Sequence, residues 1–320
     1  MTTPVLRPRE TDSAVFGKDI MGGSHEPMYS GVLSFMRRRL SRDLTGIDVA
    51  VWGIPFDAAV SYRPGARFGP QGVRRASAIL EGEPQYPFHA DPFETLAVVD
   101  YGDCALDYGR HFEAPEQIEG QALEVINSGT TLLSIGGDHY VTWPLLKAHA
   151  KKYGPMALVQ FDAHQDTWFD EDARIDHGSF VARAVRAGII RPERSIQVGI
   201  RTHAPDDCGL EIIYSNDVQD LGVKGVVERI KARAGDAKTY ITFDIDCLDP
   251  AYAPGTGTPV AGGLSSREAL MILRQLGSLD IAGADVVEVA PAYDHADTTS
   301  IAGAAVLQHY LGLLAERKAK

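Results

Sequence analysis

The sequence predicts an α/β fold built on a mostly parallel sheet. Short apolar runs alternate along the chain with stretches of helical periodicity, and Gly, Pro and capping residues separate them. Parallel strands need a crossover between them, usually a helix, and this alternation supplies one. No Pro/Ser-rich linker, repeat or low-complexity run divides the chain. We therefore expect an N-terminal extension over residues 1–45 and a single domain over residues 46–320.

Apolar runs bounded by turn residues predict the strands in chain order, at residues 47–54, 96–99, 131–135, 156–161, 195–200, 239–243 and 281–289. The first strand is followed by residues 55–70, which are rich in Pro and Gly and favour a loop. Residues 100–103 are predicted to turn the chain after the second strand.

Helices are predicted between these strands, at residues 115–128, 143–153, 177–187, 221–234, 265–276 and 300–317. Thr142 is a candidate N-cap for the second of them, with Pro144 in its first turn and Gly154 after its end. Ser265 and Glu268 have the spacing of a capping box at the start of the fifth.

Composition excludes some classes of partner. The chain of 320 residues has 31 Lys and Arg against 43 Asp and Glu, which argues against nucleic acid or an anionic membrane surface and is compatible with a cationic substrate. Its 3 cysteines are widely spaced, as suits a reducing compartment. No apolar stretch has the length of a signal peptide core or a membrane span. We expect a cytoplasmic protein.

The strand at 156–161 ends in a row of potential metal ligands. Successive side chains of a strand point to opposite faces, so Asp162, His164 and Asp166 would project the same way if the extended conformation persists. Two other strands end in similar groups: His139 follows the strand at 131–135, and Asp244 and Asp246 follow the strand at 239–243. Groups beyond the carboxyl ends of parallel strands converge, so we expect these side chains to meet.

Together the candidate ligands are four carboxylates and two imidazoles, more than one tetrahedral ion requires. They favour two divalent ions sharing bridging carboxylates. Carboxylates suit Mg, Ca or Mn and imidazoles suit transition metals, so two Mn²⁺ per subunit is the preferred assignment, with Fe, Ni, Co or Zn as alternatives. Two such ions, about 3.5–4 Å apart, can hold a hydroxide between them and direct it at an electrophile.

Each ligand alone has an ordinary structural explanation. An Asp-x-Asp is usually a strand end or a turn, and a single histidine is more often a core or capping residue. The occurrence of all six at strand ends makes unrelated polar residues a poor explanation. A structural zinc site is disfavoured by the carboxylates. A two-metal phosphoesterase would need basic phosphate clamps nearby, and Arg201 is the one candidate.

Longer motifs resemble the signatures of a known family. The segments are GGDH at 136–139, FDAHQD at 161–166, FDIDCLDPAYAPGTGTP at 243–259, SYRPGARFGPQGVR at 61–74, DHG at 176–178 and DVVEVAPAYD at 285–294. Taken in chain order, they resemble the signatures of the ureohydrolase family of arginases, agmatinases and guanidino-acid hydrolases, and most of all those of bacterial agmatinases. The resemblance implies a three-layer α/β/α fold and a homotrimer or homohexamer.

The resemblance also implies catalytic roles for Asp166, His177 and Glu288. His177 matches a proton-shuttling histidine, although an Asp-His-Gly alone is also compatible with a simple helix cap. Glu288 matches the residue that grips the substrate guanidinium, as a carboxylate can by bidentate pairing. Asp166 would bind metal and also accept a hydrogen bond from the bridging hydroxide. Asp249, close to the ligand pair, is interpreted as a turn residue before Pro250.

The substrate is inferred from one position at which this chain differs from the arginases and guanidino-acid hydrolases of the family. Arginases and guanidino-acid hydrolases of the family resemble one another in placing Asn two residues beyond the last Asp of the DAHxD segment, where it helps to bind a substrate carboxylate, and this chain has Trp168 there. An indole can flank an alkyl chain or face a cation. Asp170, Glu171 and Asp172 would attract a terminal ammonium, or form a solvated acidic loop. Gln165, where Thr is frequent, is expected to point away from the ligands.

These observations predict a binuclear-metal hydrolase that converts agmatine and water to putrescine and urea. His177, Glu288 and Trp168 would contact this small cationic guanidino substrate. The alternatives are a hydrolase of another guanidino compound, such as 4-guanidinobutyrate, and a non-catalytic metal-binding paralogue. The second is less consistent with the presence of both His177 and Glu288, which a scaffold would not need.

Overall fold

The computed structural model describes residues 12–22, 26–80, 85–169 and 174–319. Within these residues the chain forms one 8-stranded sheet of order β2-β1-β3-β8-β7-β4-β5-β6, and each pair of neighbours is parallel. The strands are β1 Val49–Gly53, β2 Val98–Asp103, β3 Thr131–Ile135, β4 Ala157–Phe161, β5 Ile196–Ile200, β6 Glu211–Tyr214, β7 Lys238–Asp244 and β8 Asp280–Val287. The α/β class with a parallel sheet is confirmed.

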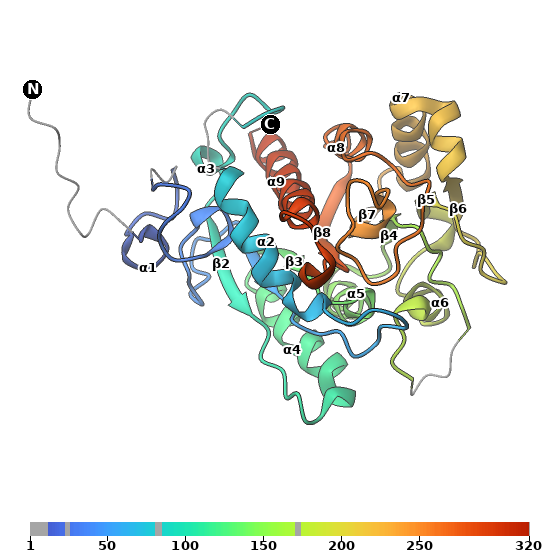
Figure 1. Cartoon of the computed structure of the whole chain (residues 1–320), viewed down its shortest axis with the longest axis horizontal. Coiled ribbons are helices and arrows are strands. Elements are labelled where there is room, and N and C mark those ends of the chain that lie inside the picture. Colours follow the sequence, from blue (N-terminus) through green and yellow to red (C-terminus); the bar gives the residue numbers. More distant parts are fainter. Residues whose placement is uncertain (1–11, 23–25, 81–84, 170–173, 320) are drawn as a thin grey trace, which may run out of the picture.

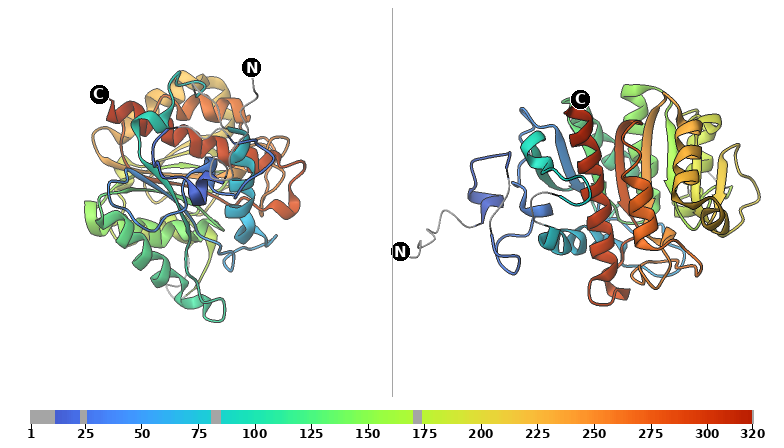
Figure 2. Two further views of the ribbon diagram at one scale, coloured as in Figure 1. Left: turned by 90° about the vertical axis from the view of Figure 1, so that its left-hand side faces the viewer. Right: turned by 90° about the horizontal axis from the view of Figure 1, so that it is seen from above.

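Helices cover both faces of the sheet. They are α1 Ser13–Phe16, α2 Gly69–Ser77, α3 Pro92–Thr95, α4 Ala114–Asn127, α5 Thr142–Tyr153, α6 Phe180–Arg186, α7 Ser215–Ala234, α8 Ser266–Leu273 and α9 Thr298–Lys318. In Figure 1, α7, α8 and α9 lie along the upper side and α4, α5 and α6 along the lower side, and the turned views in Figure 2 show the same three layers. This is the predicted α/β/α arrangement.

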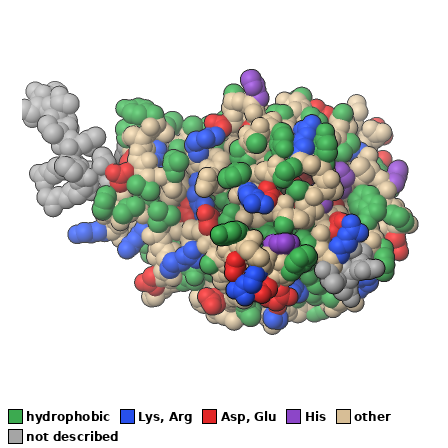
Figure 3. Space-filling model, turned by 60° about the horizontal axis from the view of Figure 1, so that its bottom comes forward, with side chains coloured by type: hydrophobic (Ala, Val, Ile, Leu, Met, Phe, Trp, Pro, Cys, Tyr) green, Lys and Arg blue, Asp and Glu red, His purple; other side chains and the backbone are tan. Residues whose placement is uncertain are grey.

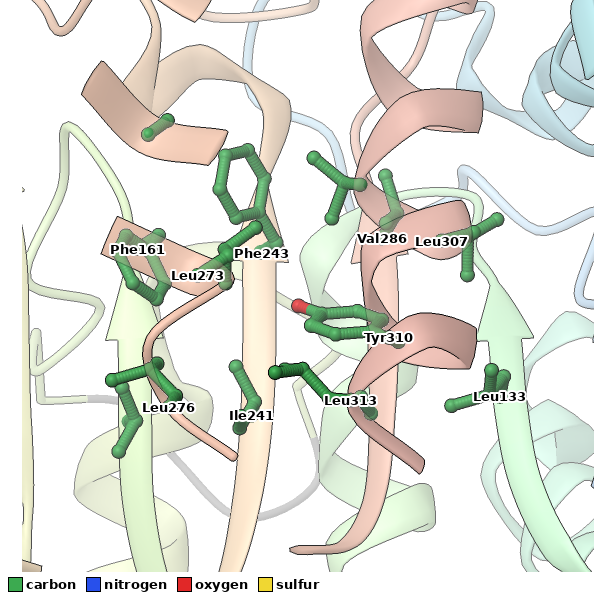
Figure 4. Close-up of a cluster of buried hydrophobic side chains, with 14 of the residues drawn as sticks. Leu133, Phe161, Ile241, Phe243, Leu273, Leu276, Val286, Leu307, Tyr310 and Leu313 are labelled. Atoms are coloured by element: carbon green, nitrogen blue, oxygen red, sulfur yellow. The ribbon is translucent and has the colours of Figure 1, made fainter. Parts of the chain in front are cut away.

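The two cores follow from the alternation of side chains along each strand. On β1, Val49 and Val51 belong to the core under α2, α7, α8 and α9, whereas Ala50 and Trp52 belong to the core under α4, α5 and α6. Figure 4 shows the first core, where Leu307 and Tyr310 of α9 lie against Val286 of β8. Because strands buried on both faces need apolar residues throughout, they appear in the sequence as continuous apolar runs.

Phe161 and Phe243 lie in the same core at the carboxyl ends of β4 and β7, with their ring centroids 5.2 Å apart. Because β7 pairs with β4, and β8 lies between β7 and β3, the strand order places β3, β8, β7 and β4 side by side. All candidate ligands lie at or just beyond the carboxyl ends of β3, β4 or β7. The topology therefore gathers them at one edge of the sheet.

Several predictions of local structure are wrong. Residues 100–103 continue β2 rather than turning, because the Asp100 carboxylate is buried in an ion pair with Arg74 (2.7 Å). The glycines and proline that suggested a loop through residue 70 instead begin α2 at Gly69. Thr142 does not cap α5, because its hydroxyl donates to Asp285 (2.9 Å). The short edge strand β6 was not predicted at all.

The segment assigned to the N-terminal extension packs against the rest of the molecule where it is described. Phe35 and Met36 are buried in the core beneath α2, and Leu40 forms a bridge with Asp100 of β2. The boundary at residue 45 stays a prediction. Over the described parts of the chain, we find no helix both long and apolar enough to span a bilayer.

His149 of α5 is a buried histidine that contributes to stability in its neutral form. Its Nδ1 lies 2.8 Å from the Leu145 carbonyl oxygen, and its ring packs edge-on against Tyr240. A Cβ at Gly283 of β8 would stand 2.3 Å from its Nε2, so only glycine leaves room for the ring. Burial lowers the pKa of His149 to about 4. The folded protein therefore resists protonating this ring.

Acidification should destabilise the fold through His149. The pKa of the folded state is below that of an unfolded histidine, so this stability is complete above about pH 6.5 and is lost as the pH falls toward 4. For metal-free protein, we expect the free energy of unfolding in urea to fall between pH 7.5 and 4.5 by about 2 to 3 kcal/mol more in wild type than in His149→Gln. Equal losses in the two proteins would refute this role.

Candidate metal centre and active site

His139 is placed by the turn that follows β3. The 3-10 turn His139–Val141 is capped by Asp138, whose Oδ1 accepts from the Tyr140 N–H (3.2 Å). Gly137 is required at the preceding position, because a Cβ there would stand 1.6 Å from the Phe56 carbonyl oxygen. The GGDH segment therefore combines a close backbone approach with a turn that directs the imidazole over the ends of the neighbouring strands.

The ligands after β4 converge, although not as an extended row. The strand ends at Phe161, and Asp166 has a left-handed φ of 52°, so the expected alternation of Asp162, His164 and Asp166 along one strand is wrong. Instead the Asp162 Oδ1 accepts from the His164 N–H (2.7 Å), which turns the chain. Asp162 and Asp166 then face His139, whereas His164 faces Asp246.

The six predicted ligands form two groups that share Asp162. In the first, the His139 Nδ1 lies 3.0 Å from Asp162 Oδ2, 3.0 Å from Asp166 Oδ2 and 3.1 Å from Asp244 Oδ2. In the second, the His164 Nδ1 lies 3.1 Å from Asp246 Oδ2 and 3.5 Å from Asp162 Oδ1. Among the described residues, two groups have ligand atoms close enough to one another to hold a metal ion: His139, Asp162 and Asp166, with Asp244 beside them, and Asp162, His164 and Asp246. A shared carboxylate between two groups is the arrangement expected for two bridged ions.

The first group fits a cation because of the tautomer of His139. The Thr242 hydroxyl donates to Asp285 Oδ1 (2.6 Å), so it accepts from the His139 Nε2–H at 2.8 Å. When this ring is neutral, its buried Nδ1 is a lone pair that faces three carboxylate oxygens and has no hydrogen-bond partner among the described residues. Metal–ligand bonds of about 2.1 Å at right angles place ligand atoms about 3 Å apart, as found here. A divalent cation satisfies all four atoms.

The crowding of acidic groups shifts their titration. Burial is the main cause that raises the pKa of Asp166 to about 7, and repulsion from the Asp162 carboxylate is the second. Burial, followed by repulsion from Asp246, raises the pKa of Asp244 well above its usual range. Burial opposes protonation of His164, but Asp246 and Asp162 outweigh it and raise its pKa to about 12. A cation would favour the ionised carboxylates and so remove this cost.

Glu288, His177 and Ser61 form a line beside the two groups. Glu288 directly follows β8, is fully buried and has a left-handed φ of 64°, a strained backbone of the kind found at functional sites. Its Oε1 accepts from the His139 N–H (2.8 Å) and lies 2.9 Å from the His177 Nδ1, whereas its Oε2 has no hydrogen-bond partner in the described part of the chain. The His177 Nε2 lies 2.8 Å from the Ser61 hydroxyl. Burial opposes protonation of His177. The negative charge of Glu288, with smaller contributions from Asp138 and Asp166, outweighs this effect and raises the pKa of His177 to about 9.

A cavity of about 380 Å³ opens over these residues. It is lined by Ser61, His139, His164, Asp166, Trp168, Phe169, Arg174, Asp176, His177, Gly178, Asp244 and Thr258. Trp168 therefore lies at the cavity wall, and Gln165 points away, with its Oε1 accepting from the Ala204 N–H (2.6 Å). The proposed acidic loop of Asp170, Glu171 and Asp172 lies outside the described residues.

Two residues near the ligands have structural roles. Asp249 accepts from the backbone N–H groups of Ala251, Gly262 and Gly263, which confirms the turn predicted before Pro250. The Arg201 guanidinium donates to backbone carbonyls, among them those of Val260 (2.7 Å) and Asp246 (2.6 Å). Its donors are used within the fold, which removes it as a phosphate clamp.

Sequence reasoning missed the residues that orient the ligands. Besides Thr242 and Asp285, these include Gln160, whose amide donates to Asp162 Oδ2 (2.6 Å). On β7 and β4, Thr242 and Gln160 each lie two residues before a ligand, on the same side of the strand. This spacing is the one signal that would have identified them.

Comparisons with known proteins agree with this geometry. The family model described as the arginase family matches residues 47–312. The chain belongs to the arginase family. Within that family it is 52% identical over 309 residues to the agmatinase of Chromobacterium violaceum, covering 96% of each chain, and 46% identical over 272 residues to an agmatinase of Neisseria meningitidis, covering 85% of this chain and 88% of the other.

Solved structures of similar proteins show the same fold. A hypothetical agmatinase from Burkholderia thailandensis superposes with a TM-score of 0.95 at 50% identity, covering 97% of this chain and 98% of the other. The proclavaminate amidino hydrolase of Streptomyces clavuligerus superposes with a TM-score of 0.84 at 37% identity, covering 91% of this chain and 100% of the other. The hypothetical agmatinase and the proclavaminate amidino hydrolase therefore share the fold of this chain.

Proposed function

We propose that this arginase-family protein is an agmatinase, which hydrolyses agmatine to putrescine and urea. The protein is a hydrolase acting on guanidino compounds, in keeping with its family and with its agmatinase relatives. The observation that carries the proposal is the pair of ligand groups sharing Asp162 beneath a cavity that also contains His177. We further propose two Mn²⁺ per subunit, held by His139, Asp162, His164, Asp166, Asp244 and Asp246.

When bound, two divalent cations would lower the pKa of water at the site and so provide a nucleophile near neutral pH. Glu288 supplies the complementary group for the substrate. Its Oε2 has no partner among the described residues, and the carboxylate is buried, so it can form strong charge-assisted bonds with a guanidinium. Holding the planar group in one orientation lowers the entropic cost of attack.

The proton balance of the reaction explains why two proton carriers are present. Attack of water on the guanidinium carbon and cleavage of its bond to the alkyl nitrogen give urea and an alkylammonium, so both protons of the water end on the leaving nitrogen. Asp166, whose carboxylate lines the cavity beside the ligand groups, is suited to move one of them. His177, at the wall of the same cavity, is suited to exchange the other with solvent.

Agmatine is the proposed substrate because of Trp168. The indole lies at the cavity wall, where it can flank an alkyl chain but cannot provide the paired amide donors that bind a carboxylate. One observation favours the alternative, 4-guanidinobutyrate. Arg174 lines the same cavity with its guanidinium 3.7 Å from Asp176, and this cation would attract a substrate carboxylate rather than an ammonium.

Urea release by the Mn²⁺-loaded protein tests these assignments. With agmatine, arginine and 4-guanidinobutyrate under identical conditions, we expect kcat/KM for agmatine to exceed the others by about a hundredfold or more, since a mismatched buried charge costs about 3 kcal/mol. Preference for 4-guanidinobutyrate would overturn the substrate assignment and retain the mechanism. Absence of urea from every guanidine, with two ions bound, would point to the non-catalytic alternative.

Trp168→Asn provides the matched variant for this comparison. It introduces the amide that carboxylate-binding members of the family have at this position, so it should narrow the ratio of agmatine to 4-guanidinobutyrate. An unchanged ratio would show that Trp168 does not set specificity. Assembly as a homotrimer or homohexamer and a cytoplasmic location remain predictions, which sedimentation and cell fractionation would test.

A further inference from the structure

The loop between β1 and α2 is held over the site by two buried carboxylates. Asp138 Oδ2 accepts from the Ala59 N–H (2.7 Å), and Asp57 Oδ2 accepts from the Gly65 N–H (2.8 Å). The Ala59 carbonyl in turn lies 3.4 Å from the His177 N–H. Asp138 is the residue that also caps the turn carrying His139. One carboxylate therefore links the position of this loop to the position of a metal ligand.

Ser61 is the residue of this loop that contacts His177. Its hydroxyl lies 2.8 Å from the His177 Nε2, and its backbone N–H points to the same nitrogen at 3.2 Å. The other nitrogen, Nδ1, lies 2.9 Å from Glu288 Oε1. The ring is therefore held at both ends, by Glu288 on the buried side and by Ser61 on the exposed side of the cavity.

We propose that Ser61 is a positioning residue for the hydrolysis, which holds His177 in the orientation that carries protons between the site and solvent. This proposal rests on the proposed function. A hydroxyl suits the role because it can both donate and accept. It donates to Nε2 when the ring is neutral and accepts from Nε2–H when the ring is charged, whereas the backbone N–H of Ser61 can only donate. Ser61 is therefore the partner that fits both states of the ring.

The passage of a proton through Ser61 is balanced without any further reactant. Nε2–H gives its proton to the Ser61 oxygen as the hydroxyl gives its own to a water at the cavity mouth, and the reverse steps recharge the ring. Ser61 is exposed, so water can reach it.

The charged groups that face the His177 ring are Glu288, Asp138 and Asp166, and the cavity wall adds Arg174 and Asp176. Glu288, Asp138 and Asp166 favour the charged ring.

Replacement of the hydroxyl tests the proposal. In Ser61→Ala the charged ring loses the acceptor that the Ser61 hydroxyl provides at Nε2, while the neutral ring keeps the backbone donor. With agmatine and Mn²⁺, we expect kcat to fall about tenfold and KM to stay within about twofold. Ser61→Thr, which keeps the hydroxyl, should retain at least about half of the wild-type kcat. Metal content should be equal in all three proteins.

A second measurement does not depend on turnover. With Mg²⁺ bound in place of paramagnetic Mn²⁺, the pKa of His177 can be followed by the NMR signal of its ring. We expect this pKa to be lower in Ser61→Ala than in wild type by about half a pH unit or more, and to be restored in Ser61→Thr. An unchanged pKa in Ser61→Ala, or an unchanged kcat, would overturn the role of Ser61. Inactive wild type with the expected pKa difference would instead overturn the proposed substrate while leaving the Ser61–His177 contact established.

Discussion

Replacing Asp162 with asparagine is expected to empty both halves of the metal centre. Asp162 is the member common to the two ligand groups, with Oδ2 3.0 Å from the His139 Nδ1 and Oδ1 3.5 Å from the His164 Nδ1. An asparagine cannot bridge two cations, and its amide would face the Gln160 amide that now donates to Oδ2. Bound Mn²⁺, measured by mass spectrometry after dialysis, should fall from two ions per subunit to less than one.

Activity should fall with the metal. A metal ion stabilises the transition state by several kcal/mol, so kcat should drop about a thousandfold or more. Asp246→Asn is the matched control, because Asp246 belongs to the second group alone and its loss should leave about one ion per subunit. Retention of two ions by folded Asp162→Asn would contradict the shared-ligand arrangement. Equal losses in the two variants would show that the ions bind only as a pair.

The part of the metal centre that could be predicted from the sequence is the set of ligands at the ends of strands. The apolar runs that became β3, β4 and β7 are continuous because both of their faces are buried, and a candidate ligand follows each run: at once for Asp162 and Asp244, and after a Gly-Gly-Asp turn for His139. Convergence followed from the rule that parallel strands present their carboxyl ends at one edge. The order of the strands did not follow, because β7 and β8 enter between β3 and β4 only through long-range pairing.

The alternation rule failed where the backbone left the strand. It placed Asp162, His164 and Asp166 in one row, but the left-handed backbone at Asp166 divides them between two groups. Such a conformation in a non-glycine residue is stabilised by its surroundings and leaves no local signal. The buried hydrogen bonds that join His139 to Thr242 and Thr242 to Asp285 were not predicted for a related reason. These residues are distant in sequence, and each resembles an ordinary strand residue.

Replacing Glu288 with glutamine is expected to abolish most of the activity while leaving the metal centre intact. In the wild type, Glu288 Oε1 lies 2.8 Å from the His139 backbone nitrogen and 2.9 Å from the His177 Nδ1. Glutamine keeps an oxygen that can accept from both groups, so the fold around the site should persist. The lost feature is the buried negative charge. Removing one partner of a buried charge pair costs about 3–5 kcal/mol. We expect kcat/KM for agmatine to fall by a factor of about 10² to 10³, with two ions still bound.

The pH dependence separates this role from a purely structural one. Glu288 is the main group that raises the pKa of His177 to about 9, so in Glu288→Gln the limb of the pH–rate profile that reports this histidine should move to lower pH. Asp249→Asn is the control, because that carboxylate lies close to the ligands in sequence but is turned toward the N–H groups of Ala251, Gly262 and Gly263. Its loss should reduce thermal stability and leave the profile in place. A Glu288→Gln enzyme whose kcat/KM stays within about tenfold of wild type would mean that another group binds the guanidinium, because a buried charge pair cannot be lost at so small a cost.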